Sequence, residues 1–367
     1  MVQINIYCSD EIECMPIIVS RMDSFYEESF DCLEFARSVP YCVDNGGPRQ
    51  QWNAINSYMD ASNVYGSTDE MADELRSKTD GKLKIDGNNL LPDKGPNLLA
   101  GDVRNAEMPG LASMHTLFVR EHNRICDLIK TVRPEWNDEK VFQNARRILI
   151  GQYQSIVYAG YLPVVLGSEN MDGLALSAAG SEYDDTLDPS MTNEFATAAD
   201  RFGHSMIQGL IKLFHTDNSG QFDEFVLGQN WFNKAKYRSY MDNILMGLMS
   251  QPAQAFDKSV TDQVTNFLFP EKHDTSATSD LAARNIQRGR DHGLPGFCCY
   301  YKLYQDENKN CNEGWDMKYE GISQTNWQLL QEIYLHPNDI DLFTGGLAQE
   351  PYNGAVVGTV FWFMLSK

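Results

Sequence analysis

The stretch Leu111–Ile129, LASMHTLFVREHNRICDLI, indicates the fold class of this chain. Apolar residues recur in it at intervals of three, four and seven, namely Leu111, Met114, Phe118, Ile125 and Ile129. This spacing places them on one face of an amphipathic helix, which we expect to end near Pro134. A second helix is predicted after Asn137 and Asp138, which can cap it, and should run to Gly160 or Pro163.

Two more segments, Glu194–Phe214 and Thr325–Leu335, also predict helices, and Pro337 stops the second of them. Strand-like alternation is scarce. The first hundred residues are rich in Pro, Gly, Asn and Asp and predict loops and short turns. We therefore expect a mainly α fold with little β structure, built as one large helical domain.

Composition excludes several classes of partner. The 367 residues carry 30 Lys+Arg against 51 Asp+Glu, a formal net charge of -21, which argues against nucleic acid and anionic lipid as partners. With 42% hydrophobic residues the chain can bury a sizeable core. The longest apolar run, Ala355–Leu365, is well short of the roughly 20 residues that a membrane-spanning helix needs.

The eight cysteines lack the paired spacing of a zinc site, so disulfides are the preferred interpretation and reduced buried thiols the alternative. Cys14, Cys32 and Cys42 are candidates for linking the N-terminal segment, and Cys311 for pairing with Cys298 or Cys299. The connectivity stays open. The first ten residues show no signal peptide, which points either to reduced cysteines or to a chain without its true N-terminus.

The common short motifs of metal hydrolases and nucleotide enzymes are absent from the sequence, so the histidines are the next candidates for chemistry. His115 and His122 lie about 10 Å apart along one predicted helix, so we expect packing roles for both. His204 follows Gly203, whose presence within a predicted helix costs about 1 kcal/mol and needs a reason. Close approach of a flat cofactor such as haem is one reason, but from this segment alone a packed histidine is the preferred explanation.

Two charge-rich segments accompany His204. They are RNAEMPG, which starts at Arg104 and contains Glu107, and NIQRGRDHG, which starts at Asn285. On composition alone, a solvated turn is the preferred explanation of either segment.

Taken together, these segments resemble the animal haem peroxidases. The resemblance covers NAINSYMDASNVYGS (53–67), residues 100–167 with RNAEMPG, MHTLFVREHNR and YAGYLPVVLG, residues 202–208, LAARNIQRGRDHGLPGF (281–297) and DIDLFTGGL (339–347). The order of these segments is that of the family. The resemblance implies a helical haem peroxidase fold, haem b and calcium as cofactors, and hydrogen peroxide as a substrate.

On the proximal side of the haem, the resemblance implies that His204 is the iron ligand. Asn285 would accept a hydrogen bond from the other ring nitrogen of His204, which orients the imidazole. Arg201 and Arg288 match arginines near the haem propionates.

On the distal side, Arg104 matches the arginine that stabilises the anionic peroxide oxygen. Glu107 matches the carboxylate that attaches the haem covalently through an ester. For Met108 a packing role is expected, with a sulfonium bond to a haem vinyl group as the alternative. The calcium loop of the family matches four residues that can offer oxygen ligands: Asn56, Tyr58, Asp60 and Ser62.

The chain also departs from the family pattern. The Asp-His-Asp segment that carries the distal base is not found before Cys14, and the match stops near Gly358. We therefore expect residues 1–367 to form a partial peroxidase domain that lacks the N-terminal distal-histidine segment and C-terminal helices. Its expected function is peroxide-driven oxidation of a halide, thiocyanate or phenol; the alternative is a catalytically impaired haem-binding or adhesion protein. The cysteines and the resemblance together indicate an extracellular location.

Overall fold

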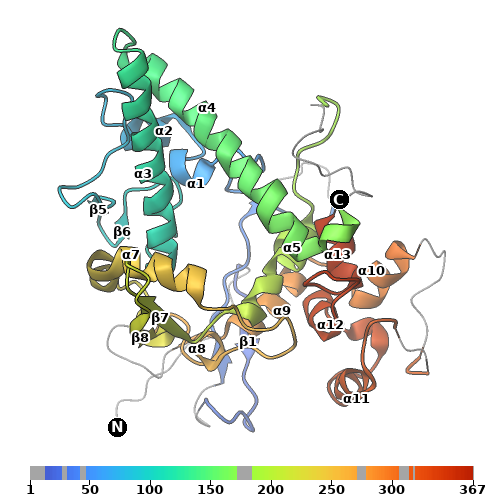
Figure 1. The fold of residues 1–367 in the computed structure, drawn as a ribbon. Helices are drawn as coiled ribbons and strands as arrows, with labels where there is room; N and C mark the ends of the chain where they lie inside the picture. Colours follow the sequence, from blue (N-terminus) through green and yellow to red (C-terminus); the bar gives the residue numbers. More distant parts are fainter. Residues whose placement is uncertain are drawn as a thin grey trace.

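The computed structural model describes residues 13–26, 31–41, 47–171, 184–270, 278–305, 314–316 and 319–366. Helices dominate the described residues, which confirms the predicted fold class (Figure 1). The α-helices are α1 Ser62–Tyr65, α2 Asp69–Leu75, α3 Pro109–Val132, α4 Asp138–Ile156, α5 Leu162–Leu166, α6 Asn193–Thr197, α7 Lys234–Ser250, α8 Asp262–Thr265, α9 Leu281–Asp291, α10 Phe297–Tyr304, α11 Gln324–Ile333, α12 Leu342–Ala348 and α13 Thr359–Leu365.

The strands in the described residues form two-stranded antiparallel pairs only. They are β1 Ile17–Ile18 with β2 Cys32–Leu33, β3 Pro40–Tyr41 with β4 Gln50–Gln51, β5 Asp93–Lys94 with β6 Asn97–Leu98, and β7 Leu210–Phe214 with β8 Gln221–Val226. Only the last pair is longer than two residues in each strand.

Helices α3 and α4 confirm the two long helices predicted from apolar spacing. Pro109 stands in the first turn of α3, where its missing N–H costs nothing, and α4 begins behind Asn137, whose side chain accepts the Lys140 N–H at 2.9 Å. The two helices pack together where α3 ends and α4 begins and then diverge, and α7 packs across the beginning of α3 (Figure 1).

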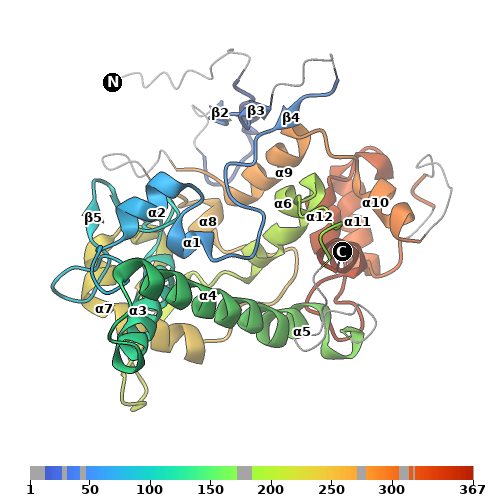
Figure 2. The same ribbon diagram turned by 90° about the horizontal axis from the view of Figure 1, so that it is seen from above.

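Helix α4 does not stop at Gly160 but continues through a π-helical turn, Val157–Tyr161, into α5 (Figure 2). The first half of this rod buries Val141, Phe142 and Leu149 in a core shared with α1, α3 and α7. Its far end buries Val165 and Leu166 in a second core, shared with α10, α12 and α13. One continuous rod therefore links the two hydrophobic cores.

The prediction of a single helix over Glu194–Phe214 is wrong. The segment contains α6, a 3₁₀ helix over Ala199–Met206 and strand β7. Ala198 breaks the helical path with φ -131° and ψ -60°, and from Leu210 the chain pairs with β8. The turn between the strands contains Asn218 and Gly220, both with positive φ, so a hairpin signal was present in the sequence.

The predicted disulfides are tested only in part. Cys32 is disulfide-bonded, whereas Cys14 carries a free thiol. Cys42 and Cys311, together with Cys8, lie outside the described residues. Among the described helices, none has the length and apolar character that crossing a membrane requires.

Candidate functional site

His204 and Asn285 come together although they are 81 positions apart in the sequence. His204 lies in the 3₁₀ helix Ala199–Met206, and Asn285 lies on α9, fully buried. The Nδ2 of Asn285 is 2.7 Å from the Nδ1 of His204. The two residues singled out from separate segments of the sequence are therefore direct neighbours.

The direction of this hydrogen bond is the reverse of the expected one. Arg201, one 3₁₀ turn before His204, donates from Nη1 to Oδ1 of Asn285 at 2.7 Å. A guanidinium can only donate, so it engages the amide oxygen and leaves the amide nitrogen facing His204. Asn285 therefore donates to Nδ1 of His204, and the ring proton of the neutral imidazole is on Nε2.

Burial sets the charge states of His204 and Arg201. It lowers the pKa of His204 to about 4, and the nearby Arg201 adds to this effect, so the imidazole is neutral at pH 7. Burial, together with Arg288, lowers the pKa of Arg201 to about 10, which still leaves it cationic. No carboxylate of the described residues forms an ion pair with Arg201. The site thus combines a neutral imidazole with a partly buried cation that favours an anionic ligand.

Gly203, next to His204, is not required by protein packing. Apart from its chain neighbours and the nearby backbone of its own helix, no atom of the described residues lies within 4 Å of the position that a Cβ would occupy there. The space beside His204 is therefore compatible with a flat group, which was the reason the sequence suggested for this glycine.

Arg288, one helical turn after Asn285, is engaged by protein partners. Its Nη1 donates to the carbonyl oxygen of Ala36 at 3.0 Å, to Oγ of Ser38 at 3.1 Å and to Oδ2 of Asp291 at 3.0 Å. The guanidinium also lies 4.1 Å from the ring centre of Phe35. Arg288 therefore attaches the N-terminal segment to α9.

Sequence reasoning missed Asp291 and His292, the two residues that complete this attachment. The Asp291 side chain is inaccessible to solvent and binds Arg37 at 2.7 Å as well as the backbone N–H of Ser38 at 2.8 Å. His292 contacts Oγ of Ser38 at 2.7 Å. The available signal was an aspartate and a histidine directly after two arginines in the segment RGRDH.

Arg104, expected on the distal side, is held by its own loop. It donates to Asp102 from Nε at 3.0 Å and from Nη2 at 2.7 Å, and its side chain is 56% exposed. The hydrogen bond from Arg104 lowers the pKa of Asp102. Burial raises the pKa of Glu107, although Arg104 opposes this shift. Met108 stands just before α3, and its methyl group packs against Gly110.

The predicted calcium-loop residues form one turn. Asn56 donates from Nδ2 to Oδ2 of Asp60 at 2.6 Å, while its Oδ1 accepts the Tyr58 N–H at 2.8 Å. Oδ1 of Asp60 accepts the Ser62 N–H at 3.1 Å, and the Tyr58 side chain is exposed. The turn thus gathers one carboxylate and several neutral oxygens, a set suited to a hard cation.

An open cleft of about 1280 Å³ joins this turn to Arg104. Its lining includes Asn56, Ser62 and His115, together with Met191 and, on α6, Phe195. The structure therefore places the turn at Asn56 and the side chain of Arg104 in the lining of one cleft.

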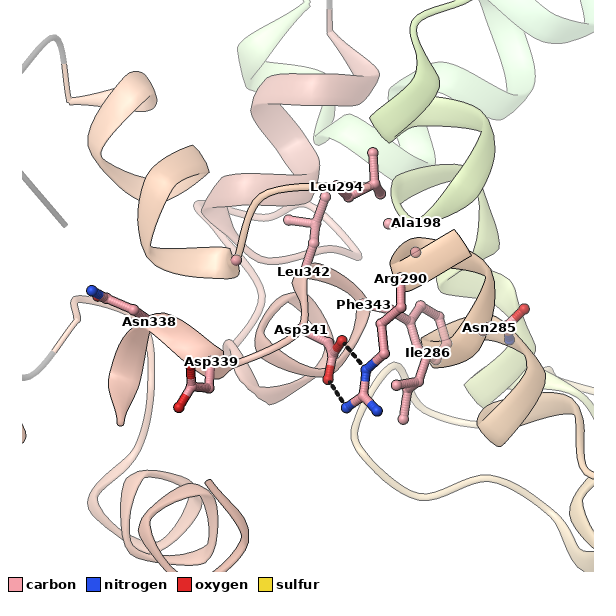
Figure 3. A pocket seen from close by; sticks show the side chains of 12 residues that line it. Ala198, Asn285, Ile286, Arg290, Leu294, Asn338, Asp339, Asp341, Leu342 and Phe343 are labelled. Atoms are coloured by element: carbon pink, nitrogen blue, oxygen red, sulfur yellow. Dashed lines mark hydrogen bonds and ion pairs between the residues drawn. The ribbon is translucent and has the colours of Figure 1, made fainter. Parts of the chain in front are cut away.

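Asn285 lines a separate pocket of about 350 Å³ (Figure 3). Arg290 and Asp341 form a two-point ion pair in it, at 2.9 Å and 2.8 Å, and the amide of Asn285 points away from that pair.

Comparisons with known proteins agree with this arrangement. A family model described as "Animal haem peroxidase" matches residues 2–367. Chorion peroxidase of Aedes aegypti is 35% identical over 378 residues, which cover 96% of this chain and 46% of that protein. Myeloperoxidase of Mus musculus is 36% identical over 389 residues, which cover 95% and 52%. The chain spans about half the length of these curated relatives.

Solved structures give the same result for the fold. Peroxidase A from Dictyostelium discoideum matches with a TM-score of 0.82 and 27% identity, over 98% of this chain and 73% of that one. A fatty acid alpha-dioxygenase of Oryza sativa matches with a TM-score of 0.74 at 20% identity, over 97% of this chain and 63% of that one, a likeness of fold alone.

Proposed function

Because the chain belongs to the animal haem peroxidase family, we propose that it binds haem b through His204 and uses hydrogen peroxide to oxidise a small donor. The observation that carries the proposal is the buried hydrogen-bonded series Arg201, Asn285 and His204. It supplies a neutral imidazole, a group that orients it, and a cation next to both. Haem, when bound, supplies the electron transfer with peroxide that protein side chains alone do not perform.

The residues present fit this cofactor. The open space beside Gly203 suits a flat ring, and Arg201 has no carboxylate partner in the described part of the chain, which suits a propionate. Arg288 is kept as the second propionate partner on the family resemblance alone, because its guanidinium already pairs with Asp291 in this structure. Its contacts with Ala36, Ser38 and Asp291 fix its position on α9.

His204 would hold the iron through a ring nitrogen, and Asn285 would orient the ring through the other nitrogen. A propionate bound by Arg201 would compete with Oδ1 of Asn285 for the guanidinium. An Asn285 amide released from Arg201 would be free to turn its Oδ1 toward Nδ1 of His204, the orientation that the family resemblance implies. Arg201 would in this way link binding of the cofactor carboxylate to the tautomer of His204.

On the distal side we assign Arg104 to stabilising negative charge on peroxide, and Glu107 to the ester with haem. The raised pKa of Glu107 favours an uncharged side chain, and an ester is uncharged. Met108 keeps a packing role. Asn56, Tyr58, Asp60 and Ser62 are the proposed calcium ligands, with Asp60 as the charged one.

The donor we propose is a halide, thiocyanate or a phenol, and the location extracellular. The family and the cysteines support this location. Residues 1–367 as one partial peroxidase domain remain a prediction, and the activity is proposed for the whole protein, because the chain spans about half of its relatives.

A second candidate, a haem-binding or adhesion protein with impaired catalysis, is favoured by the pairing of Arg104 with Asp102. This carboxylate neutralises the guanidinium that would otherwise stabilise an anionic oxygen.

The two candidates differ in peroxide turnover by the haem-loaded full-length protein. We expect peroxide-dependent oxidation of a phenolic dye, reduced about a hundredfold in Arg104→Leu but unchanged in Arg124→Leu, whose exposed side chain pairs with Glu121. A full-length protein that binds haem but oxidises no dye would refute the peroxidase and favour the second candidate.

A further inference from the structure

A second buried polar cluster lies away from His204, where α1 meets α3. It consists of Tyr65 at the end of α1 and His122 and Cys126 on successive turns of α3. Tyr65 is 1% exposed, and the other two are inaccessible to solvent. The proposed peroxidase reaction uses none of them.

The hydrogen bonds of the cluster have a defined direction. The carbonyl oxygen of Gly81 lies 2.9 Å from Nε2 of His122, and because a carbonyl only accepts, Nε2 carries the ring proton. Nδ1 of His122 therefore accepts, and its partner is the Tyr65 hydroxyl at 2.8 Å. The Cys126 thiol donates to the same carbonyl at 3.3 Å.

All three side chains are uncharged at neutral pH. Burial lowers the pKa of His122 to about 4, opposed by the Gly81 carbonyl and assisted by Arg76. Burial raises the pKa of the Cys126 thiol to about 12 and also raises that of Tyr65. The phenol thus donates to an imidazole that is free to accept a proton.

The hydrogen bond from the Tyr65 hydroxyl to Nδ1 of His122 gives the phenol a proton acceptor if it is oxidised. A phenol that loses one electron becomes a strong acid and must release its proton, and inside a protein that proton needs a base already in contact. The guanidinium of Arg146 lies 5.2 Å from the Tyr65 ring centre and disfavours a retained positive charge on the ring. Arg76, the other nearby cation, is paired with Asp138 and Glu139.

We propose that Tyr65 is a redox-active tyrosine and that His122 holds its proton. One electron passes from Tyr65 to haem that hydrogen peroxide has oxidised, so the haem is reduced by one electron. The O–H bond of Tyr65 breaks, and its proton goes to Nδ1 of His122. The products are a neutral phenoxyl radical and an imidazolium that donates from Nδ1 to the phenoxyl oxygen and from Nε2 to Gly81. This inference rests on the proposed function, which supplies the oxidant.

The position of α1 connects this cluster to the proposed distal side. Gly101, in the loop that leads to Arg104, packs so closely on α1 that a Cβ there would overlap the carbonyl oxygen of Ser62. His115 of α3 also contacts the carbonyl oxygen of Asn63 at 3.0 Å. Tyr65 therefore belongs to a helix that packs directly on the loop carrying Arg104.

The chain contains a matched control, Tyr237 of α7. It is also fully buried, but its hydroxyl contacts Oγ1 of Thr116 at 2.7 Å and accepts the Leu91 N–H at 3.1 Å. Since Thr116 itself donates to the carbonyl oxygen of Ala112, Tyr237 donates to a hydroxyl, which is a poor base. The two tyrosines share burial and differ in the proton acceptor.

The test uses the haem-loaded full chain, mixed with one equivalent of hydrogen peroxide without donor, frozen rapidly and measured by electron paramagnetic resonance. We expect a tyrosyl radical signal that narrows when the chain contains ring-deuterated tyrosine. The signal should persist in Tyr237→Phe and disappear in Tyr65→Phe. In His122→Gln, which keeps a polar side chain without the base, it should also disappear. Melting curves verify that the variants are folded.

The outcomes separate this inference from the function it rests on. A chain that forms no haem complex by its Soret band refutes the proposed function and this inference with it. Haem binding followed by a tyrosyl signal that survives Tyr65→Phe, or is lost equally in Tyr237→Phe, refutes this inference alone. If the variants at Tyr65 and His122 do not fold, two measurements can still be made on folded protein: the narrowing of the signal with ring-deuterated tyrosine and the comparison of the wild type with Tyr237→Phe. A signal that is absent or does not narrow then overturns the proposal.

Discussion

At the scale of single residues, the site depends on which atom of Asn285 faces His204. The sequence predicted that the two residues meet, because each stood in a segment typical of the family. It did not predict that Arg201 would occupy the amide oxygen, since that depends on a 3₁₀ helix bringing Arg201 within 2.7 Å of α9. Orientations of this kind come from contacts across 84 positions of sequence and leave no local pattern.

Removing Arg201 should change the tautomer of His204 in the chain without haem. In Arg201→Leu the Asn285 amide is free to rotate, so we expect a larger population with the ring proton on Nδ1. The ¹⁵N chemical shifts of His204 report this directly. Arg290→Leu, which breaks a pair with Asp341 on the other side of α9, serves as the control. Equal shifts in both variants and the wild type would contradict the coupling.

The pKa of His204 also predicts how haem affinity depends on pH. Only the neutral imidazole binds iron, and with a pKa of about 4 it remains neutral at pH 5. We expect less than about a twofold change in affinity between pH 7 and pH 5, whereas a histidine with the ordinary pKa near 6.5 would lose about 30-fold. Soret titrations at both pH values distinguish these cases.

At the scale of elements, apolar periodicity predicted α3 and α4 because both are long and bury one face. It failed over Glu194–Phe214, where α6, a 3₁₀ helix and β7 each occupy a few residues. Periodicity needs more than two turns to be recognised. The functional histidine thus lies in the segment where sequence pattern is least informative, and the motif around it had to supply the assignment.

Helix α9 depends on Asp280, whose side chain accepts the Ala283 N–H at 3.0 Å as the N-cap. Asp280→Ala should lower the free energy of unfolding by about 1 kcal/mol, while Asp280→Asn keeps an acceptor and should cost a few tenths. Because α9 carries Asn285 and Arg288, haem affinity should fall in the same order. Urea unfolding and Soret titration measure the two effects. Equal losses in both variants would show that the cap is not what holds α9.

At the scale of the whole molecule, long-range attachments complete the fold. The α4 to α5 rod joins the two cores, and the N-terminal segment is attached to α9 through Arg37, Ser38 and Arg288, whose partners are about 250 positions away. The helical class followed from the sequence, but these attachments did not, because nothing local specifies which turn a buried Asp291 will bind.

The buried histidines predict how stability varies with pH. The pKa of His122 falls from 6.5 to about 4 on folding. The stability that the folded chain has from keeping this imidazole neutral is therefore complete above pH 6.5 and is lost as the pH falls toward 4. For this residue the loss amounts to about 3 kcal/mol. His204 and His292, whose pKa values also fall to about 4, act in the same direction. Buried acids act in the opposite direction, since burial raises the pKa values of Glu107, Asp200 and Asp280.

Subtracting the free energy of unfolding of His122→Gln from that of the wild type cancels the contributions of the other titratable groups, because both proteins contain them. The free energy of unfolding of the wild type should fall more steeply than that of the variant between pH 6.5 and 4. Urea unfolding across this range measures both. Parallel curves would show that His122 does not change its pKa on folding.

The central claim, that this chain carries the proximal half of a haem site, is tested most directly by titrating the purified chain with ferric haem and following the Soret absorbance. His204→Ala is the test variant and His215→Ala, an exposed histidine on the β7–β8 hairpin, is the matched control. We predict a saturable shift at one haem per chain that persists in His215→Ala and is lost in His204→Ala. No shift in the folded chain, or an equal shift in His204→Ala, would contradict the assignment of His204 as the iron ligand.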